Sequence, residues 1–261
     1  MFTSQETYIL TADIGNTMTS FVVFKGARAV DRHRIETSVS QKLFSRHVEK
    51  MLHVLQRKYP KLSVVLVCSV VPSALRLVQK VFARSFQGKV LVAGKNLRIP
   101  IKNNYRAARQ VGQDRLACAY AAKMLYGSPS IVIDFGTALT MDVVCAQGAY
   151  EGGVIVPGIR LSLRALAEHT ALLPQVKIQK PSYLIGRNTQ ESILSGMFHG
   201  YTALIEGLVA KMKKKFSRRA IVILTGGYGN FMGTSLKRCV DKFEPDLVLK
   251  GLLLAFCATK D

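Results

Sequence analysis

The sequence predicts an α/β fold of two related domains with a cleft between them. Each half of the chain opens with a pair of apolar strands, and an Asp-x-Gly motif with small polar residues interrupts each pair. The first motif starts at Asp13 and the second at Asp134. Helices then alternate with buried strands in both halves, which is typical of an α/β domain. A duplicated domain explains why the arrangement recurs near mid-chain.

The first half is expected to begin with a hairpin. Residues 41–60 carry apolar side chains with a period of 3.6, which predicts an amphipathic helix, and Pro72 is a suitable first residue for another helix. The expected strands are 8–14, 20–26, 62–70 and 89–94, with 32–36 as a further candidate, and the second helix is 72–86.

The second half repeats the pattern. Asn188 is a good N-cap for a long helix because Glu191 follows three residues later. The expected strands are 130–136, 139–148, 150–158 and 220–227, and the expected helices are 159–169, 188–216 and 251–258. A helix at 111–125 marks the boundary, so we expect domains of approximately residues 1–115 and 116–261.

Charge is the unusual feature of the composition. The chain of 261 residues holds 37 Lys and Arg against 16 Asp and Glu, a net charge of +21. Such a charge favours anionic partners, including nucleotides, carboxylate substrates and nucleic acid. The one dense basic run, residues 211–219, is either the solvated end of a helix, where cations complement the helix dipole, or a nucleic-acid patch.

The remaining bulk features favour a cytoplasmic protein. Five cysteines lie far apart without metal-binding spacing, which is typical of reduced thiols. The five histidines match no motif. The first ten residues lack the basic region of a signal peptide, and the longest apolar run, residues 64–71, is too short to span a bilayer. We therefore expect no membrane partner.

The two Asp-x-Gly motifs have the chemistry of phosphate-binding loops. Each places a carboxylate at a strand end and follows it with a glycine, which allows backbone N–H groups to approach an anion closely. The carboxylate can hold a cation or its bound water. No P-loop motif with its lysine occurs in the chain. A single Asp-x-Gly is often an ordinary turn, so the signal comes from the repeat.

A Thr-Gly-Gly turn at residues 225–227 adds a third element to the two motifs. This trio resembles the two phosphate loops and the adenosine loop of the actin-like ATPase and sugar-kinase superfamily. The resemblance implies two related actin-like (ribonuclease H-like) domains and a nucleotide in the cleft between the domains.

Within that superfamily the chain is similar to the type III pantothenate kinases from Asp13 to about Leu252. The motifs DIGNT, YRAARQVGQDR, DFGTALTMD, EGGVIVPG, IGRNT, LTGG and PDLVLKGL occur in that family's order. The resemblance implies ATP-dependent phosphorylation of pantothenate to 4′-phosphopantothenate, the first step of coenzyme A biosynthesis. It also implies Mg²⁺ and a monovalent cation, K⁺ or NH₄⁺. Arg106 follows Tyr105 where family members often carry Asn-Pro.

The resemblance assigns the substrate side of the site. Asp114 aligns with the family's proton acceptor, although an Asp-Arg pair at a helix start is the alternative reading. Packing is the alternative for Tyr105, and a place in the helix start after Asn188 is the alternative for Thr189. The pantothenate-binding residues implied by the family are Tyr105, Gly112, Gln113, Asp114, Arg115 and Thr189.

The resemblance also assigns the nucleotide side. Asp13 is the candidate for holding Mg²⁺, directly or through a bound water molecule, and Asp134 matches the monovalent-cation ligand. The residues implied to bind ATP are Asp13, Ile14, Gly15, Asn16, Thr17, Met18, Thr19, Ser20 and Thr137.

Two other functions remain as alternatives. Some proteins of this family are described as transcriptional activators, and the charge of +21 would assist DNA binding. The basic residues show no helix-turn-helix pattern, so we expect no nucleic-acid partner. A different actin-like kinase acting on another hydroxylated acid is the third reading. Because the family usually forms homodimers, the resemblance implies a homodimer here.

Overall fold

The structure, a computed structural model, describes residues 7–259. The chain forms two compact units, one containing the residues up to Met124 and from Asp246 onward, the other Leu125–Pro245. The sequence predicts a division near residue 115 with everything after it in the second domain, whereas the structure returns the residues from Asp246 onward to the first unit. Residues 1–6, on which the expectation about a signal peptide partly rests, lie outside the described residues.

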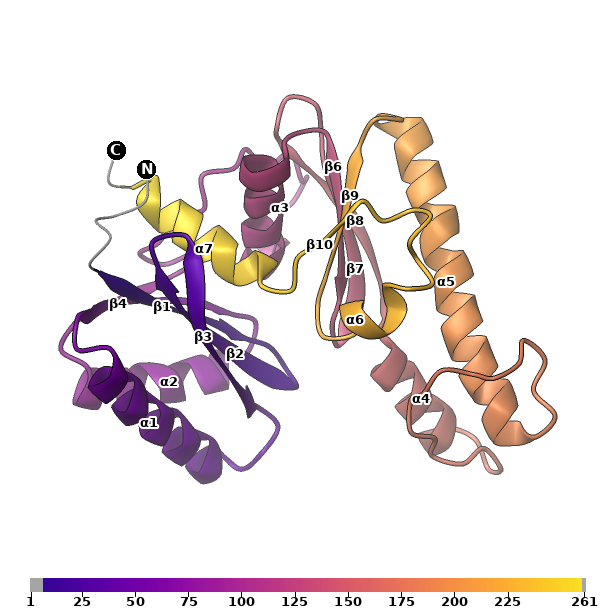
Figure 1. The fold of residues 1–261 in the computed structure, drawn as a ribbon, viewed down its shortest axis with the longest axis horizontal. Helices are drawn as coiled ribbons and strands as arrows, with labels where there is room; N and C mark the ends of the chain where they lie inside the picture. The colour runs from indigo at the N-terminus through magenta and orange to yellow at the C-terminus, as the bar shows by residue number, and fades with distance from the viewer. Residues whose placement is uncertain (1–6, 260–261) are drawn as a thin grey trace. The chain divides into compact units, whose positions relative to one another are not determined.

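The first unit is built on a five-stranded sheet with the order β3-β2-β1-β4-β5 (Figure 1). β1 is antiparallel to β2 and parallel to β4. The sheet therefore joins a three-stranded meander to two parallel strands. Its elements are β1 (Tyr8–Ile14), β2 (Met18–Lys25), β3 (Arg28–Glu36), α1 (Gln41–Lys58), β4 (Leu62–Ser69), α2 (Pro72–Ser85), β5 (Lys89–Val92), the 3₁₀ turn η1 (Ala108–Gln110), α3 (Gln113–Tyr126) and α7 (Leu247–Cys257).

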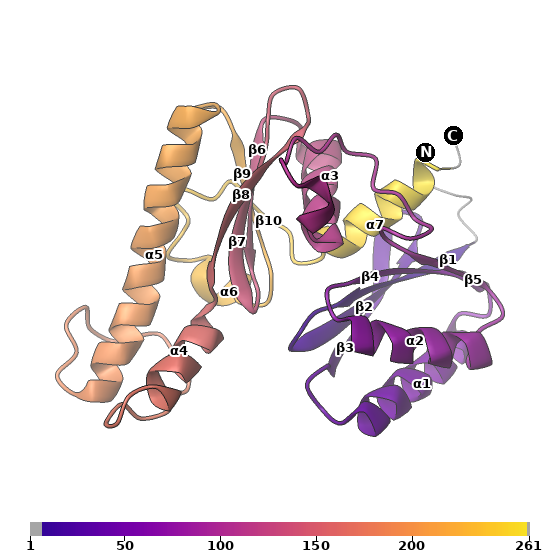
Figure 2. The ribbon, with the colours of Figure 1, turned by 180° about the vertical axis from the view of Figure 1, so that it is seen from behind.

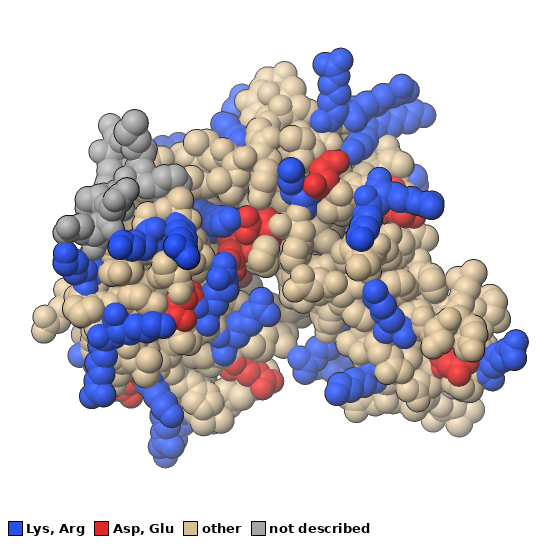
Figure 3. Space-filling model, viewed as in Figure 1, with Lys and Arg blue, Asp and Glu red and all other residues tan. Residues whose placement is uncertain are grey.

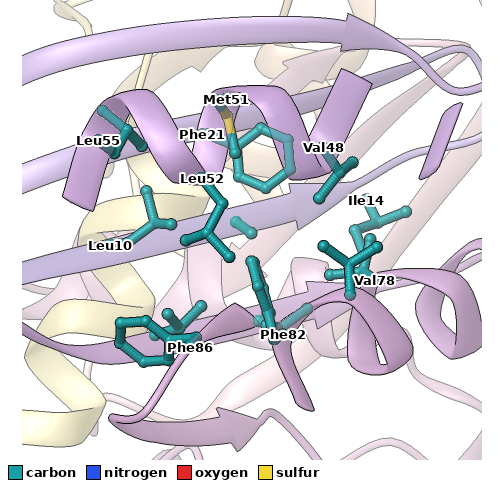
Figure 4. Close-up of a cluster of buried hydrophobic side chains, with 14 of the residues drawn as sticks. Leu10, Ile14, Phe21, Val48, Met51, Leu52, Leu55, Val78, Phe82 and Phe86 are labelled. Atoms are coloured by element: carbon teal, nitrogen blue, oxygen red, sulfur yellow. The ribbon is translucent and has the colours of Figure 1, made fainter. Parts of the chain in front are cut away.

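α1 and α2 cover one face of this sheet. The amphipathic period of residues 41–60 is confirmed, because α1 buries one stripe of apolar side chains against the sheet. Figure 4 shows these side chains meeting those of β1, β2 and α2. The cluster includes Leu10, Ile14, Phe21, Val48, Met51, Leu52, Leu55, Val78, Phe82 and Phe86.

α7 belongs to the first unit because it packs on β1, the central strand of the sheet, and on its neighbour β4. A close approach of α7 to α3 adds to this packing. A Cβ on Gly251 would lie 2.2 Å from the carbonyl oxygen of Ala117, so glycine is needed where the two helices meet. Local sequence patterns predict these helices, but the sheet that they cover depends on contacts across the whole chain.

The second unit repeats the topology of the first, with the sheet order β10-β9-β6-β7-β8 (Figure 2). β6 is antiparallel to β7 and parallel to β9, as β1 is to β2 and β4. The predicted duplication is therefore visible in the pairing of the strands. The elements are β6 (Ser130–Phe135), β7 (Ala138–Val144), β8 (Tyr150–Pro157), α4 (Ile159–Glu168), α5 (Thr189–Lys215), β9 (Ile221–Thr225), α6 (Gly229–Met232) and β10 (Lys242–Phe243).

α5 is the longest helix of the second unit, and its ends carry the expected capping residues. The Asn188 side chain accepts a hydrogen bond from the N–H of Glu191 (2.9 Å). Three lysines occupy the last turn, where they complement the helix dipole. By length and composition α5 could cross a membrane. Its buried residues, which include Ile205 and Val209, pack in the core of the unit, as in an ordinary core helix.

Lys and Arg are spread over both units on the visible face of the molecule, with a group near the end of α5 (Figure 3).

None of the five cysteines forms a disulfide, and Cys68, Cys118 and Cys257 are buried. Among the described residues, no group of three or more His, Cys, Asp or Glu side chains could hold a metal ion. A metal in this part of the chain would therefore need ligands in addition to one or two such side chains.

Candidate functional site

The first Asp-x-Gly motif forms the tight turn between β1 and β2. The N–H of Gly15 donates to the carbonyl of Met18 (3.1 Å), which closes the turn. A Cβ on Gly15 would lie 3.0 Å from that carbonyl oxygen, so a larger residue would press on the turn. Asp13 stands at the end of β1, between Ser20 on β2 and Cys68 on β4.

The side chains of this loop divide between the core and the solvent. Ile14 and Thr19 are fully buried, and Ile14 packs in the hydrophobic core. Asn16 and Met18 are exposed, whereas Asp13 is partly buried. Ile14 and Thr19 can therefore offer a ligand only their backbone groups.

The segment after β3 holds the loop in place. The N–H of Thr37 donates to the carbonyl of Thr17 (2.9 Å), and the hydroxyls of Thr37 and Thr19 lie 2.8 Å apart in a hydrogen bond. Thr37 thus fixes both sides of the turn. No local sequence signal marks this residue, because its role depends on the pairing of β2 with β3.

Asp114 lies in the first turn of α3, in the same unit as the first loop. Its Oδ1 accepts a hydrogen bond from the N–H of Arg115 (2.8 Å). A Cβ on Gly112 would lie only 2.3 Å from that oxygen. Gly112 is therefore required for the Asp114 carboxylate to take this position, which gives the glycine of the GQDR motif a steric role.

Asp13 and Asp114 both act on the buried thiol of Cys68. Burial and, after it, the negative charges of Asp13 and Asp114 raise the pKa of the Cys68 thiol well above its usual value. Because one buried group feels both charges, the structure brings the two carboxylates into the same region of the first unit. The thiol stays neutral and adds no third negative charge.

The other expected substrate residues of the first unit surround α3. Tyr105 is 36% exposed, and its N–H donates to Oδ1 of Asn103 (3.0 Å). Asn103 also donates to the carbonyl of Ala108 (3.3 Å), so one side chain holds the loop that lacks the family's Asn-Pro. The Gln113 side chain packs against Gly94, whose φ of +77° turns the chain after β5.

The second Asp-x-Gly motif forms the corresponding turn between β6 and β7. The N–H of Gly136 donates to the carbonyl of Ala138 (3.1 Å), which makes this turn shorter than the first. Asp134 is the second-last residue of β6 and lies beside the Thr-Gly-Gly turn. A Cβ on Gly226, whose φ is +90°, would lie 2.4 Å from Oδ1 of Asp134.

The Pro-Gly turn after β8 lies against the same loop. The N–H of Gly158 donates to the carbonyl of Thr137 (3.0 Å). A Cβ on Gly158 would lie 2.4 Å from the Thr137 oxygen and 2.5 Å from the Gly136 oxygen. Tyr201 holds this turn, because its hydroxyl donates to the carbonyl of Pro157 (2.6 Å). Oxygen atoms of Asp134, Gly136 and Thr137 therefore lie close to the two glycine turns.

Thr189 lies apart from the second loop in sequence, at the first position of α5, where it is exposed. A pocket of about 260 Å³ is lined by its neighbours Asn188 and Gln190 and by the segment around Tyr183. Glu191 steadies this helix start by accepting from the N–H of Arg187 (2.8 Å). Thr189 itself is not among the residues that line the pocket.

Each unit thus gathers part of the expected site. The first unit holds the first loop and brings Asp13 and Asp114 to a common buried group, whereas the second unit joins the second loop to two glycine turns. Sequence reasoning missed the supporting residues Thr37 and Tyr201. Gly158 and Gly226 were visible as parts of the PG and TGG motifs, but their steric roles needed the structure.

Comparison with known proteins shows which family the sequence resembles. A family profile described as "Type III pantothenate kinase" matches residues 9–211. A type III pantothenate kinase of Caulobacter vibrioides is 38% identical over 251 residues, covering 94% of this chain and 95% of its own length.

Two solved structures extend the comparison to the fold. A Campylobacter jejuni protein described as a conserved Baf family transcriptional activator has a TM-score of 0.61 at 16% identity, covering 96% of this chain and 98% of its own. A ROK family glucokinase from Streptomyces griseus, solved with glucose and AMPPNP, has a TM-score of 0.58 at 12% identity, covering 97% and 100%. The expected two-domain actin-like fold is confirmed.

Proposed function

This chain belongs to the type III pantothenate kinase family, and we propose how its own residues carry out that reaction. The chain transfers a phosphoryl group from ATP to pantothenate and yields 4′-phosphopantothenate, the first step of coenzyme A biosynthesis. The family match over nearly the whole chain carries this conclusion.

Asp114 is the residue that accepts the proton of the pantothenate hydroxyl. Phosphoryl transfer depends mainly on positioning and charge neutralisation, so a carboxylate that orients the hydroxyl is sufficient. The backbone hydrogen bond to Asp114 and the absence of a side chain at Gly112 support this role, because together they hold the carboxylate in one orientation.

The first loop, Asp13 to Ser20, binds phosphate groups of ATP. Its backbone N–H groups and the side chains of Asn16 and Thr17 are the donors, whereas Ile14 and Thr19 contribute backbone only. Asp13 is the ligand for Mg²⁺, directly or through water. One carboxylate with ligand phosphates suits this ion, so the lack of a cluster of acidic residues in the described chain is compatible with it. Bound Mg²⁺ neutralises negative charge on the ATP phosphates.

The second loop binds ATP through Thr137 and the monovalent cation through Asp134. K⁺ and NH₄⁺ interact with oxygen atoms, and the loop offers the Asp134 carboxylate together with backbone carbonyls. The carbonyls of Gly136 and Thr137 both face Gly158, which supports the presence of a suitable set of oxygen donors.

The pantothenate site includes further residues besides Asp114. Pantothenate binds to Tyr105, Gly112, Gln113 and Arg115, and Thr189 is a further pantothenate-binding residue. The Arg115 guanidinium suits the carboxylate of the substrate.

The enzyme acts in the cytoplasm as a homodimer, without a membrane or nucleic-acid partner. The match to the Campylobacter jejuni protein shows the fold alone, so no observation favours a DNA-binding regulator.

Release of ADP tests the proposal. Purified protein with ATP and Mg²⁺ should release ADP only when pantothenate and K⁺ or NH₄⁺ are both present. Asp114→Asn should lower kcat at least about 100-fold, the lower range for loss of a general base. Glu49→Gln removes one exposed carboxylate on α1 and serves as the matched control with unchanged kcat.

Two outcomes would contradict the proposal. Full activity of Asp114→Asn would remove Asp114 from the reaction. Absence of pantothenate-dependent ADP release by the wild-type protein, combined with salt-sensitive binding to duplex DNA, would favour the regulatory function instead.

A further inference from the structure

The end of β3 runs beside the first phosphate loop and carries an arginine that the assignments above leave unused. In the antiparallel pairing of β2 with β3, Arg34 lies directly opposite Ser20. Ser20 in turn lies opposite Asp13 on β1. Directly opposed residues share one face of a sheet. Arg34, Ser20 and Asp13 therefore form a row across three strands.

This row lies on the face of the sheet that does not carry the α1–α2 core. The neighbouring row, Ile35, Thr19 and Ile14, is buried, and Ile14 and Ile35 pack in that core. Neighbouring strands are about 4.8 Å apart, so Arg34 and Asp13 are separated by about 10 Å across the sheet. The small Ser20 side chain leaves room above it for a long side chain from Arg34.

Arg34 has no partner of its own among residues 7–259. Its side chain is exposed and makes no hydrogen bond or ion pair with any of these described residues. Arg32, two residues earlier on the same face, is different: its Nε and Nη2 lie 2.9 and 2.8 Å from Oδ2 of Asp246. β3 therefore presents two guanidinium groups: that of Arg32 is neutralised by Asp246, and that of Arg34, next to the loop, is available to an anion.

The loop itself needs such a charge. The residues from Asp13 to Ser20 include one carboxylate and no Lys or Arg. A polyphosphate brought to this loop would therefore meet a negative side chain and no cationic one. A guanidinium offers several N–H donors in a fixed plane and binds two phosphate oxygens at once, which a single backbone N–H does not.

The strand that carries Arg34 is fixed relative to the loop. Thr37, three residues further on, donates to the Thr17 carbonyl (2.9 Å) and shares a hydrogen bond with the Thr19 hydroxyl (2.8 Å). These contacts hold the end of β3 against both sides of the turn. The position of the Arg34 backbone is thus as well defined as that of the loop.

We propose that Arg34 binds phosphate oxygens of the nucleotide held by the first loop. This inference rests on the proposed nucleotide role of residues 13–20 and adds a cationic side chain to it. The absence of a P-loop lysine is then offset by an arginine supplied from the neighbouring strand. Its guanidinium would attract the phosphates and hold them over Ser20, beside Asp13.

Direct binding of MgATP, measured by isothermal titration calorimetry on the full chain, tests this inference. Arg34→Ala should weaken MgATP binding about tenfold or more, the scale for loss of a hydrogen-bonded charge. It should raise the KM for ATP and leave the KM for pantothenate unchanged. Arg34→Lys should restore part of the affinity, because it returns the charge without the planar pair of donors.

Arg28→Ala is the matched control, because Arg28 is exposed at the other end of the same strand, opposite Lys25. It removes the same charge from the chain. Equal MgATP affinities for Arg34→Ala and Arg28→Ala would overturn the inference. A folded Arg34→Gln variant, verified by circular dichroism, replaces Arg34→Ala if that variant does not fold.

Asp13→Asn separates this inference from the nucleotide assignment on which it rests. If Asp13→Asn alters MgATP binding and Arg34→Ala does not, the role of Arg34 is wrong and the loop assignment stands. If neither variant alters binding, both are wrong. Because binding is measured without pantothenate, loss of the kinase activity would not obscure the result.

Discussion

Replacing Gly226 by alanine should disturb the second loop through a single methyl group. Gly226 has φ of +90°, a backbone conformation that residues with a side chain rarely adopt. The added Cβ would lie 2.4 Å from Oδ1 of Asp134 and 2.5 Å from the backbone nitrogen of Phe135. Both distances are far below van der Waals contact, and one of the two atoms belongs to the backbone.

The expected cost follows from these two effects. A positive φ costs a residue with a side chain about 1–2 kcal/mol, and an extra methyl group in a packed region costs about 1–3 kcal/mol. Gly226→Ala should therefore lower the free energy of unfolding by about 2–5 kcal/mol. A loss of 1 kcal/mol lowers the Tm of a chain of this size by about 2–4 °C, so the variant should lose about 4–20 °C in Tm.

Thermal unfolding followed by circular dichroism measures this effect, and Gly227→Ala is the control. Gly227 is the next residue in the same turn, but nothing lies within 4 Å of its added Cβ and its φ is not positive. The control should keep the wild-type Tm within a few degrees. Equal Tm values for the two variants would refute the steric argument. Under the assignment proposed above, Gly226→Ala should also weaken binding of the monovalent cation, because its methyl group displaces Asp134.

Two further predictions concern ionisable groups in the first unit. Burial raises the pKa of the Asp31 carboxyl, but hydrogen bonds from Lys58 and Tyr59 outweigh it and hold the pKa below its usual 3.8. The ionised Asp31 carboxylate therefore stabilises the fold above pH 3.8, and this stabilisation is lost as the pH falls through its lowered pKa. Asp31→Asn should lower the free energy of unfolding, measured with urea, less at pH 2.5 than at pH 7. Cys68, fully buried, should resist iodoacetamide until the protein unfolds, and rapid labelling of native Cys68, detected by mass spectrometry, would contradict the structure.

The sequence predicted the two loops and the domain duplication well because their signals are local. An acidic residue at a strand end, followed by glycine and small polar residues, is visible in five consecutive positions at Asp13 and again at Asp134. The strand pairs on both sides are apolar runs, and the structure shows the same pairing around β1 and β6.

The weaker predictions depended on pairing between distant segments. Residues 32–36 gave only a candidate strand, whereas β3 begins at Arg28, and its register with β2 places Arg34 beside the loop. Polar and charged side chains alternate irregularly along this edge strand, so its hydrophobic pattern is faint. The sequence likewise carried no sign that Thr37 holds the loop.

The division into units shows the same limit. The last helix was expected at residues 251–258 as part of the second domain, but α7 begins at Leu247 and packs on β1 and β4 of the first unit. Its apolar composition specifies burial without specifying which sheet it covers. The fit of Gly251 against the Ala117 carbonyl helps to select the partner, and this contact joins residues more than a hundred positions apart.

The sequence by itself determined the class of fold, the two Asp-x-Gly turns and, through its motifs, the family. Those properties reside in short segments whose backbone preferences and residue types act locally. The tertiary structure decided which groups lie in one region: Asp13 is paired with Cys68 across β1 and β4, the charge of Asp114 acts on the same buried thiol, and Arg34 lies in a row with Ser20 and Asp13. These relations depend on strand register and helix packing, which arise from the balance of many contacts across the folded chain.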